Sequence, residues 1–163
     1  LMKAVIEVND RTNMSVVERL ARLLKNPKGK TVGLLGLTYK AHTSTLRHSL
    51  ALQLAARMRK HGMVLKAYDP VIPAERTGVR SEVHEWDVPK YIEVCGSIAD
   101  VAKGAHAIVV MTDKDDFRDL PLKKLGNTMK RRVLVDPVNF YTPEAASKAG
   151  FRYIAIGKGF QWH

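Results

Sequence analysis

Apolar residues near the start of the chain recur at helical spacing. The run consists of Met14, Val17, Leu20, Ala21 and Leu24, and an Asn-Pro-Lys-Gly stretch ends it. The pattern predicts a helix that precedes the first strand, acts as a connector and leads away from the domain that follows. We assign residues 1–29 to this connector. Because its beginning carries no helix cap, we expect the chain to be a fragment of something longer or a separately expressed domain.

Beyond residue 30 the pattern changes to short apolar runs separated by helical segments. The runs that predict buried strands lie at residues 31–37, 64–68, 91–94, 106–112, 133–136 and 153–156. The predicted helices lie at residues 50–58, 97–103 and 143–149, and a long polar loop is expected at 71–89. Strands that alternate with helices predict right-handed βαβ units. Residues 30–163 are therefore expected to form one α/β domain, a doubly wound, Rossmann-like parallel sheet with helices on both faces.

The composition is that of an ordinary globular protein. Of its residues, 45% are hydrophobic and 26% are charged. A length of 163 residues is enough for one domain with a proper core. No apolar run approaches the roughly 20 residues that a membrane span needs, and no secretory signal pattern opens the chain. The single cysteine excludes an internal disulfide. We therefore expect a cytoplasmic protein that does not act on a membrane.

The formal net charge of +11 favours an anionic partner. Basic residues are spread along the whole chain, and the densest cluster, at residues 130–132, directly precedes a predicted strand. No basic arm, zinc-finger spacing or RNA-binding aromatic strand accompanies this cluster. Nucleic acid is therefore kept as a minor alternative and is not an expected partner.

The loop at residues 36–49 is the first candidate site, because it joins the end of a strand to the start of a helix. Unpaired backbone N–H groups and the helix dipole make such a junction favourable for anions. Lys40 would add a point charge, and Arg47 a guanidinium fork suited to phosphate oxygens. Solvated loop charges explain the same two residues about equally well. Gly33 and Gly36 do not have the spacing of a G-x-G-x-x-G fingerprint.

Three other features allow a chemical interpretation, and in each the structural interpretation is favoured. Asp69 follows a predicted strand, where dinucleotide-binding folds place the acid that binds the ribose, but an aspartate before proline is more often a turn starter. Cys95 has no histidine near it in sequence and is expected to be buried and structural. The six histidines lack the spacing of metal ligands, so no metal site is expected.

The order of several motifs gives the chain a family resemblance. The stretch GLTYKAHTSTLRHS resembles the G-x-[AT]-[FY]-K-x-x-T-x-D-x-R-x-S motif of UDP-glucose and UDP-N-acetylmannosamine dehydrogenases. The stretches AVIEVND, VLKAYDP, AHAIVVMTDKDDFRDL, VLVDPVN and AGFRYIAIG fall in the order of that family. The resemblance covers essentially the whole chain. It is to the carboxyl-terminal UDP-binding domain and the end of the long central helix that precedes it.

This resemblance implies roles for three residues. Lys40 resembles the family lysine that contacts the phosphates of the nucleotide sugar, and Tyr39 beside it would line the substrate site. Arg47 resembles the arginine that reaches the NAD bound by another domain. The acidic positions common around that arginine are Ser, Thr and His in this chain, at 44, 45 and 48. The arginine frequent after the aspartate of the late strand is missing, since Asp136-Pro137 is followed by Val138.

The resemblance implies an enzyme of which this chain carries one part. Members of the family have an amino-terminal G-x-G-x-x-G domain for NAD and a central segment with a nucleophilic cysteine, and neither motif is found in this sequence. The implied function is the UDP-sugar-binding domain of an NAD-dependent 6-dehydrogenase that oxidises a UDP-hexose to a UDP-uronic acid. Such a domain would be inactive alone, would rely on the amino-terminal domain of the same full-length chain to hold NAD, and would be homodimeric when complete. The alternative is a free-standing α/β nucleotide-binding or regulatory module without catalysis.

Overall fold

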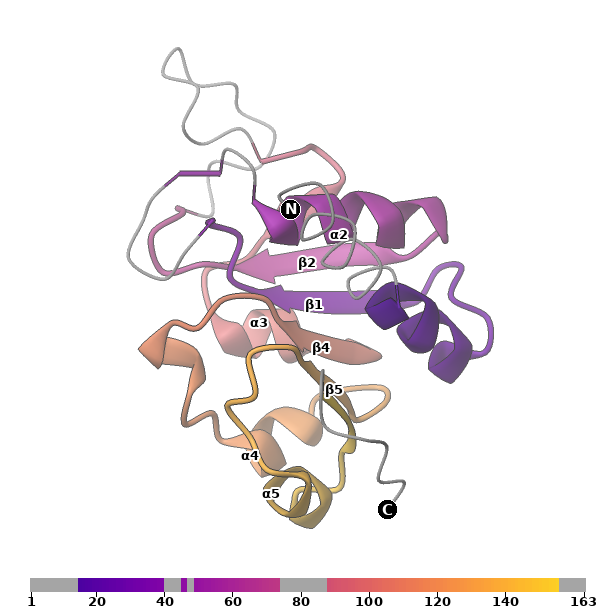
Figure 1. Cartoon of the computed structure of the whole chain (residues 1–163), viewed down its shortest axis with the longest axis vertical. Coiled ribbons are helices and arrows are strands. Elements are labelled where there is room, and N and C mark those ends of the chain that lie inside the picture. Colours follow the sequence, from indigo (N-terminus) through magenta and orange to yellow (C-terminus); the bar gives the residue numbers. More distant parts are fainter. Residues whose placement is uncertain (1–14, 40–44, 47–48, 74–87, 156–163) are drawn as a thin grey trace, which may run out of the picture.

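Six parallel strands form one sheet in the described part of the chain (Figure 1). The computed structural model describes residues 15–39, 45–46, 49–73 and 88–155. The strand order is β3-β2-β1-β4-β5-β6, and every neighbouring pair is parallel. The chain builds outward from β1 in one direction and from β4 in the other. This is the doubly wound order that the sequence predicts, with its switch point between β1 and β4.

The bounds of the elements agree with the predicted segments to within a few residues. The strands are β1 (Thr31–Leu35), β2 (Val64–Tyr68), β3 (Ile92–Val94), β4 (Ala107–Val110), β5 (Val133–Asp136) and β6 (Arg152–Ala155). The helices are α2 (Leu50–Lys60), α3 (Ile98–Ala102), α4 (Leu122–Gly126) and α5 (Pro143–Lys148), with a short 3-10 helix η2 (Asp115–Phe117). A further helical segment at residues 15–24 precedes β1.

The strands bury side chains on both faces of the sheet. In β1, Leu34 packs into the core that contains the apolar side of α2, whereas Leu35 packs into the core formed with α3, α4 and α5. In β4, Val109 packs into the first of these cores and Ile108 into the second. A sheet covered on both faces needs apolar residues at successive positions. This explains why its strands appear in the sequence as continuous apolar runs.

The helical segment at residues 15–24 packs on the sheet, which corrects the prediction that it leads away from the domain. Val16, Val17, Leu20 and Leu24 are buried and belong to the same core as α2 and β1. An apolar stripe at helical spacing must be covered by another apolar surface, and the sheet beside α2 provides one. The helix was predicted correctly, but its position was not.

Two short elements between β4 and β5 were not predicted. η2 has three residues and α4 has five, too few to show an apolar period. The predicted polar loop falls mostly on residues 74–87, which lie outside the described residues. Among the helices that the structure describes, none is long and apolar enough to cross a membrane.

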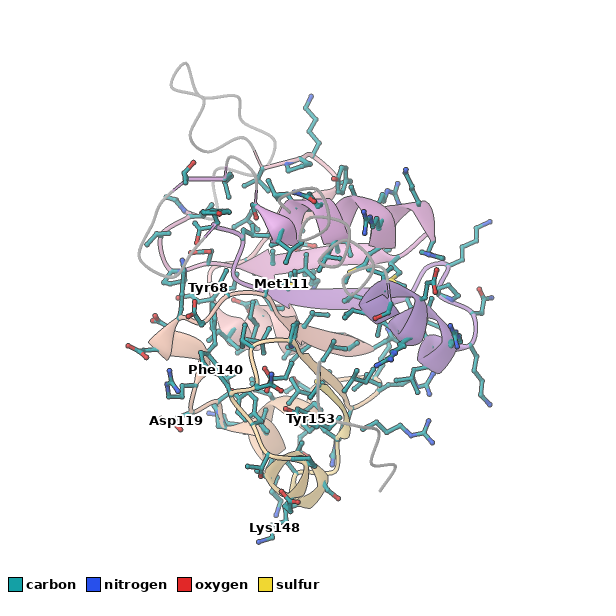
Figure 2. The ribbon with its side chains drawn as sticks, viewed as in Figure 1. Tyr68, Met111, Asp119, Phe140, Lys148 and Tyr153 are labelled. Atoms are coloured by element: carbon teal, nitrogen blue, oxygen red, sulfur yellow. The ribbon has the colours of Figure 1, made fainter. Side chains whose placement is uncertain are left out.

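The carboxyl ends of the strands meet along one edge of the sheet, on the left in Figure 1. Tyr68 ends β2 at this edge (Figure 2). Its ring packs edge-on against Phe117 of η2, with ring centroids 6.4 Å apart and an interplanar angle of 75°. The contact ties the segment after β4 to the end of β2. In doubly wound sheets ligands bind at this edge, near the switch point.

Candidate functional site

The turn after β1 requires a glycine for two independent reasons. Gly36 has a φ of +92°, in the left-handed region that residues with a Cβ rarely adopt. A Cβ at this position would also lie 2.0 Å from Oγ1 of Thr112, beyond the end of β4. The chain therefore passes closely over the end of β4 as it leaves the sheet, at the switch point.

Ser49 connects this turn to the start of α2. Its hydroxyl donates to the carbonyl of Leu37 and accepts from the backbone N–H of Leu52, which makes it the N-cap of the helix. The backbone N–H of Tyr39 donates to the carbonyl of Thr45 at 2.9 Å. The bonds to the carbonyls of Leu37 and Thr45 thus tie the residues on the two sides of the loop to each other.

Of the three site residues predicted from the sequence, Tyr39 is placed by the structure. Tyr39 is 49% exposed at the carboxyl-terminal edge of the sheet. Lys40 and Arg47 lie outside the described residues, so their roles stay predictions. Both belong to the stretch between Tyr39 and Ser49, whose two ends are anchored at this edge.

Asp69, the residue after β2, accepts hydrogen bonds from three separate segments. Its Oδ2 accepts from the backbone N–H groups of Leu37 at 2.8 Å and Thr38 at 3.2 Å, and from the Thr38 hydroxyl at 3.4 Å. Its Oδ1 accepts from the backbone N–H of Val71 at 3.1 Å and forms an ion pair with the ammonium group of Lys114. The two paired side chains are 0% and 3% exposed. Removing one partner of such a buried pair costs about 3–5 kcal/mol, because the other charge is left uncompensated.

This arrangement excludes the ribose-binding role for Asp69. A carboxylate has about four acceptor positions, and five protein donors already point at this one. The hollow beside it, lined by residues 68–73, Cys95 and Gly96, has a volume of about 240 Å³. That is below the roughly 300–1,000 Å³ of ordinary ligand pockets. The hollow beside Asp69 is therefore too small for a dinucleotide.

The favoured interpretation of Asp69 as a turn starter is confirmed, but it was incomplete. The bond from Val71, two residues further on, is the expected turn contact. The partner of Asp69, Lys114, lies 45 positions away and was not predicted. A lysine after a strand is normally solvated, and nothing in the sequence distinguishes this buried one.

A second buried carboxylate, Asp136, ends β5 at the same edge. Its Oδ2 accepts from the backbone N–H of Tyr141 and from the hydroxyl of Tyr153, both at 2.9 Å. Within the described residues its Oδ1 has no hydrogen-bond partner. Burial raises the pKa of Tyr141 to about 12, and burial together with the bond to Asp136 also raises the pKa of Tyr153. Both phenols therefore keep their protons at neutral pH and can act as donors.

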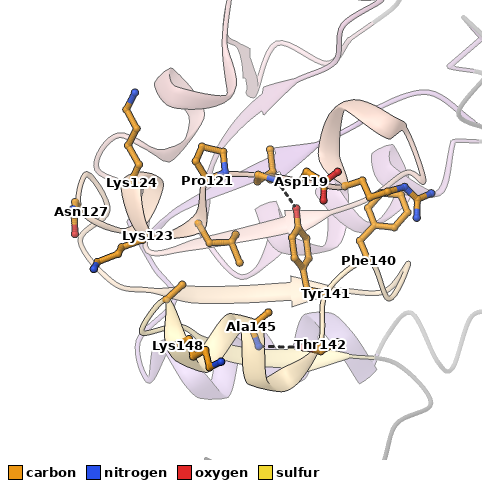
Figure 3. A pocket seen from close by; sticks show the side chains of 14 residues that line it. Asp119, Pro121, Lys123, Lys124, Asn127, Phe140, Tyr141, Thr142, Ala145 and Lys148 are labelled. Carbon is orange, nitrogen blue, oxygen red and sulfur yellow. Dashed lines mark hydrogen bonds between the residues drawn. The ribbon is translucent and has the colours of Figure 1, made fainter.

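A larger hollow of about 900 Å³ lies between α4 and α5 (Figure 3). Its charged lining residues are Arg118, Lys123, Lys124 and Lys148, with Asp119 as the one acid. Arg118 already has partners, because its guanidinium group lies 4.4 Å from the centre of the Phe140 ring and pairs with Asp115. The buried Tyr141 also lines the hollow, and its hydroxyl donates to the carbonyl of Phe117. The hollow is lined mainly by basic side chains, but the Tyr141 hydroxyl already donates to the protein backbone.

Cys95, which directly follows β3, is buried as predicted. Burial raises the pKa of its thiol, and the nearby Glu93 carboxylate adds to the increase. A thiol with a raised pKa is a poor nucleophile. Among the residues that the structure describes, no three His, Cys, Asp or Glu side chains are grouped closely enough to hold a metal ion.

The fold and the anchored loop at its switch point define an α/β protein of the nucleotide-binding type. The sequence profile of the UDP-glucose/GDP-mannose dehydrogenase family, UDP binding domain, matches residues 33–143. The chain belongs to this family. The matched region contains the loop between Gly36 and Ser49 and the two buried carboxylates, Asp69 and Asp136.

Relatives in several organisms are similar over nearly the whole chain. The chain is 29% identical over 158 residues to UDP-glucose 6-dehydrogenase TuaD of Bacillus subtilis, covering 97% of this chain and 32% of that protein. It is 31% identical over 159 residues to a UDP-glucose 6-dehydrogenase of Pseudomonas aeruginosa, covering 97% and 34%. The structure of the UDP-D-ManNAc dehydrogenase from Pyrococcus horikoshii superimposes with a TM-score of 0.72 at 25% identity, covering 94% of this chain and 32% of that one. The chain thus spans about a third of the length of these relatives.

Proposed function

We propose that this chain binds the UDP part of a UDP-sugar, as the carboxyl-terminal domain of an NAD-dependent nucleotide-sugar 6-dehydrogenase. The observation that carries the proposal is the family match over residues 33–143, which spans the switch point of the sheet. The relatives are about three times as long, which supports a further amino-terminal part. In this proposal residues 1–29 are the end of a central helix and residues 30–163 are the UDP-sugar-binding domain.

The loop after β1 provides the proposed contacts with the ligand. Lys40 binds the diphosphate, and Tyr39 lines the substrate site beside it. A phosphate near the start of α2 would also gain from the partial positive charge of the helix amino terminus. Arg47 reaches NAD, which is held mainly by the amino-terminal domain of the same full-length chain. Two observations support this proposal: Tyr39 is exposed at the sheet edge, and the loop ends are anchored there.

In the complete enzyme, the role of this domain is to position the sugar by binding the nucleotide to which it is attached. Contacts with the remote UDP would hold the sugar in place for oxidation from a UDP-hexose to a UDP-uronic acid. The complete enzyme is expected to be a homodimer. The chain by itself binds the nucleotide without oxidising the sugar, because its sequence contains no G-x-G-x-x-G fingerprint and its one cysteine is buried.

Calorimetric titration of the purified chain with UDP tests this proposal. Lys40→Ala should weaken UDP binding by about 1.5–3 kcal/mol, the usual contribution of a hydrogen bond to a charged group. Arg47→Ala should leave UDP affinity nearly unchanged, because its proposed ligand is NAD. Lys60→Ala is the matched control, since this exposed lysine lies in the last turn of α2 and away from the loop.

Two results would contradict the proposal. The first is a chain that does not bind UDP, or a Lys40→Ala variant that binds as tightly as the Lys60→Ala control. The second is production of NADH from UDP-glucose and NAD by the chain alone, which would require catalytic groups that we do not assign. Equal losses in the Lys40 and Arg47 variants would show that the proposed division between the two cations is wrong.

A further inference from the structure

The backbone N–H groups that follow β1 already donate to a carboxylate of the protein itself, that of Asp69. The N–H groups of Leu37 and Thr38 both donate to Oδ2 of Asp69, at 2.8 and 3.2 Å. In doubly wound nucleotide-binding folds ligand phosphate approaches the backbone between the first strand and the amino terminus of the helix that follows it. Here the carboxylate takes that position, and Lys114 compensates its charge from the side of β4.

The Asp69–Lys114 pair is enclosed, so it is not a solvated surface contact. The side chains of Asp69 and Lys114 are 0% and 3% exposed. The pair joins the residue after β2 to the segment after β4, and the carboxylate also holds the turn that follows β1, the strand between them. A buried carboxylate that accepts several backbone N–H bonds holds that backbone in one conformation. The restrained residues, Leu37 and Thr38, lead directly to Tyr39 and Lys40.

We propose that Asp69, held by Lys114, is a positioning residue for the UDP-binding loop. The carboxylate orients the stretch from Leu37 to Tyr39, so that the chain enters the loop in a fixed direction. Because the carboxylate occupies the N–H groups of Leu37 and Thr38, these groups are not available to ligand phosphate, which must find its donors elsewhere in the site. This inference rests on the proposed function and adds to it the residues that set where the phosphates bind.

Two double variants separate hydrogen bonding from packing. Asp69→Asn with Lys114→Met removes both charges but keeps an oxygen that can accept from the turn. Asp69→Leu with Lys114→Met fills a similar volume and removes the acceptor. Tyr153→Phe is the control for general loss of stability, because it removes the partly buried hydrogen bonding of the Tyr153 hydroxyl at β6 and leaves the turn untouched. UDP affinity is measured by calorimetry well below each variant's unfolding temperature.

The inference predicts that the Leu/Met variant loses at least tenfold in UDP affinity. The Asn/Met variant and Tyr153→Phe should stay within about threefold of the unmodified chain. If Asp69 acted only by packing, the Asn/Met and Leu/Met variants would bind UDP equally well, so rescue by asparagine alone indicates a role for the hydrogen-bond acceptor. The inference is overturned if the Leu/Met variant binds UDP normally, or if both double variants lose affinity equally.

A second measurement uses the unmodified chain and does not depend on any variant folding. In amide NMR spectra recorded during a UDP titration, the largest shifts should fall on residues 40–48. The amides of Leu37 and Thr38 should move less, because they remain bonded to Asp69. Largest shifts at these two amides would mean that phosphate binds the turn directly, which overturns the inference while UDP binding stands. No shift at any amide would instead overturn the proposed function, and the inference with it.

Discussion

Gly36 and Thr112 approach each other so closely that no side chain fits between them. A Cβ on Gly36 would lie 2.0 Å from Oγ1 of Thr112 and 2.9 Å from its Cβ. The contact joins the residue after β1 to the segment after β4, across the switch point of the sheet. The start of the candidate loop is therefore set by packing against a neighbouring strand end as well as by the conformation of the glycine.

Gly36→Ala should destabilise the fold by about 2–4 kcal/mol. About 1 kcal/mol comes from the positive φ, and about 1–3 kcal/mol from the steric conflict with Thr112. Gly104→Ala is the matched control, because Gly104 has a φ of +73° and nothing within 4 Å of the position of a Cβ. Urea unfolding measures both variants, and Thr112→Ala added to Gly36→Ala should recover part of the loss. Equal losses at positions 36 and 104 would mean that the contact with Thr112 contributes nothing.

Ser49→Ala should cost about 2 kcal/mol, more than the loss of an ordinary helix cap. Ser49 is 2% exposed, caps α2, and also donates to the carbonyl of Leu37. The alanine variant loses the cap and leaves a buried carbonyl without this donor. Thr142→Ala provides the comparison, because Thr142 caps α5 through an exposed bond to Ala145 and should cost about 1 kcal/mol. Chemical denaturation should rank the two variants in this order, and the reverse order would contradict the bridging role of Ser49.

Tyr153→Phe should destabilise the chain by about 1.5–3 kcal/mol. The single hydroxyl proton is shared between two acceptors, Oδ2 of Asp136 and the carbonyl of Tyr141, so its removal leaves a buried carboxylate with one donor fewer. The exposed Tyr91 gives a matched control, and Tyr91→Phe should stay within about 0.5 kcal/mol. Thermal unfolding of both variants checks the difference. A loss no larger than that of the control would mean that this hydroxyl does not stabilise Asp136.

His106 should make the stability of the fold depend on pH below about 6.5. Its Nδ1 accepts from the backbone N–H of Thr31 at 3.2 Å. Burial lowers the pKa of His106, and the positive charges of Lys30, Lys130 and Arg131 lower it further. Because the folded pKa is below the unfolded value, the unfolded chain takes up the proton first as the pH falls. Stability is then lost from about pH 6.5 down through the folded pKa, and no loss from this group is expected above about pH 7.5.

The variant His106→Gln isolates this contribution. Glutamine does not titrate, so the free energy of unfolding of the variant should fall less than that of the unmodified chain between pH 7.5 and 5. Urea unfolding at several pH values measures the two curves. Parallel curves would show that His106 has the same pKa in the folded and unfolded chain.

The sequence by itself determined the order and type of the main elements. Period and turn residues are local properties, so the strands from Thr31, Val64 and Val133 and the helix capped by Thr142 could be predicted from their own residues. The motif around Tyr39 and Lys40 likewise indicated the family, which the match over residues 33–143 confirms. The roles of Lys40 and Arg47 stay predictions.

The tertiary structure alone decided which polar side chains are buried and which ones pair. Asp69 and Lys114 are 45 positions apart, and their local sequences are typical of a turn and of a solvated lysine. They meet because β2 and β4 are the two neighbours of β1 in a parallel sheet, so the carboxyl ends of these three strands lie side by side. The same holds for residues 15–24, whose apolar stripe required a covering surface without specifying which one. Local pattern sets the conformation of a segment, whereas burial and pairing depend on contacts between segments that are distant in sequence.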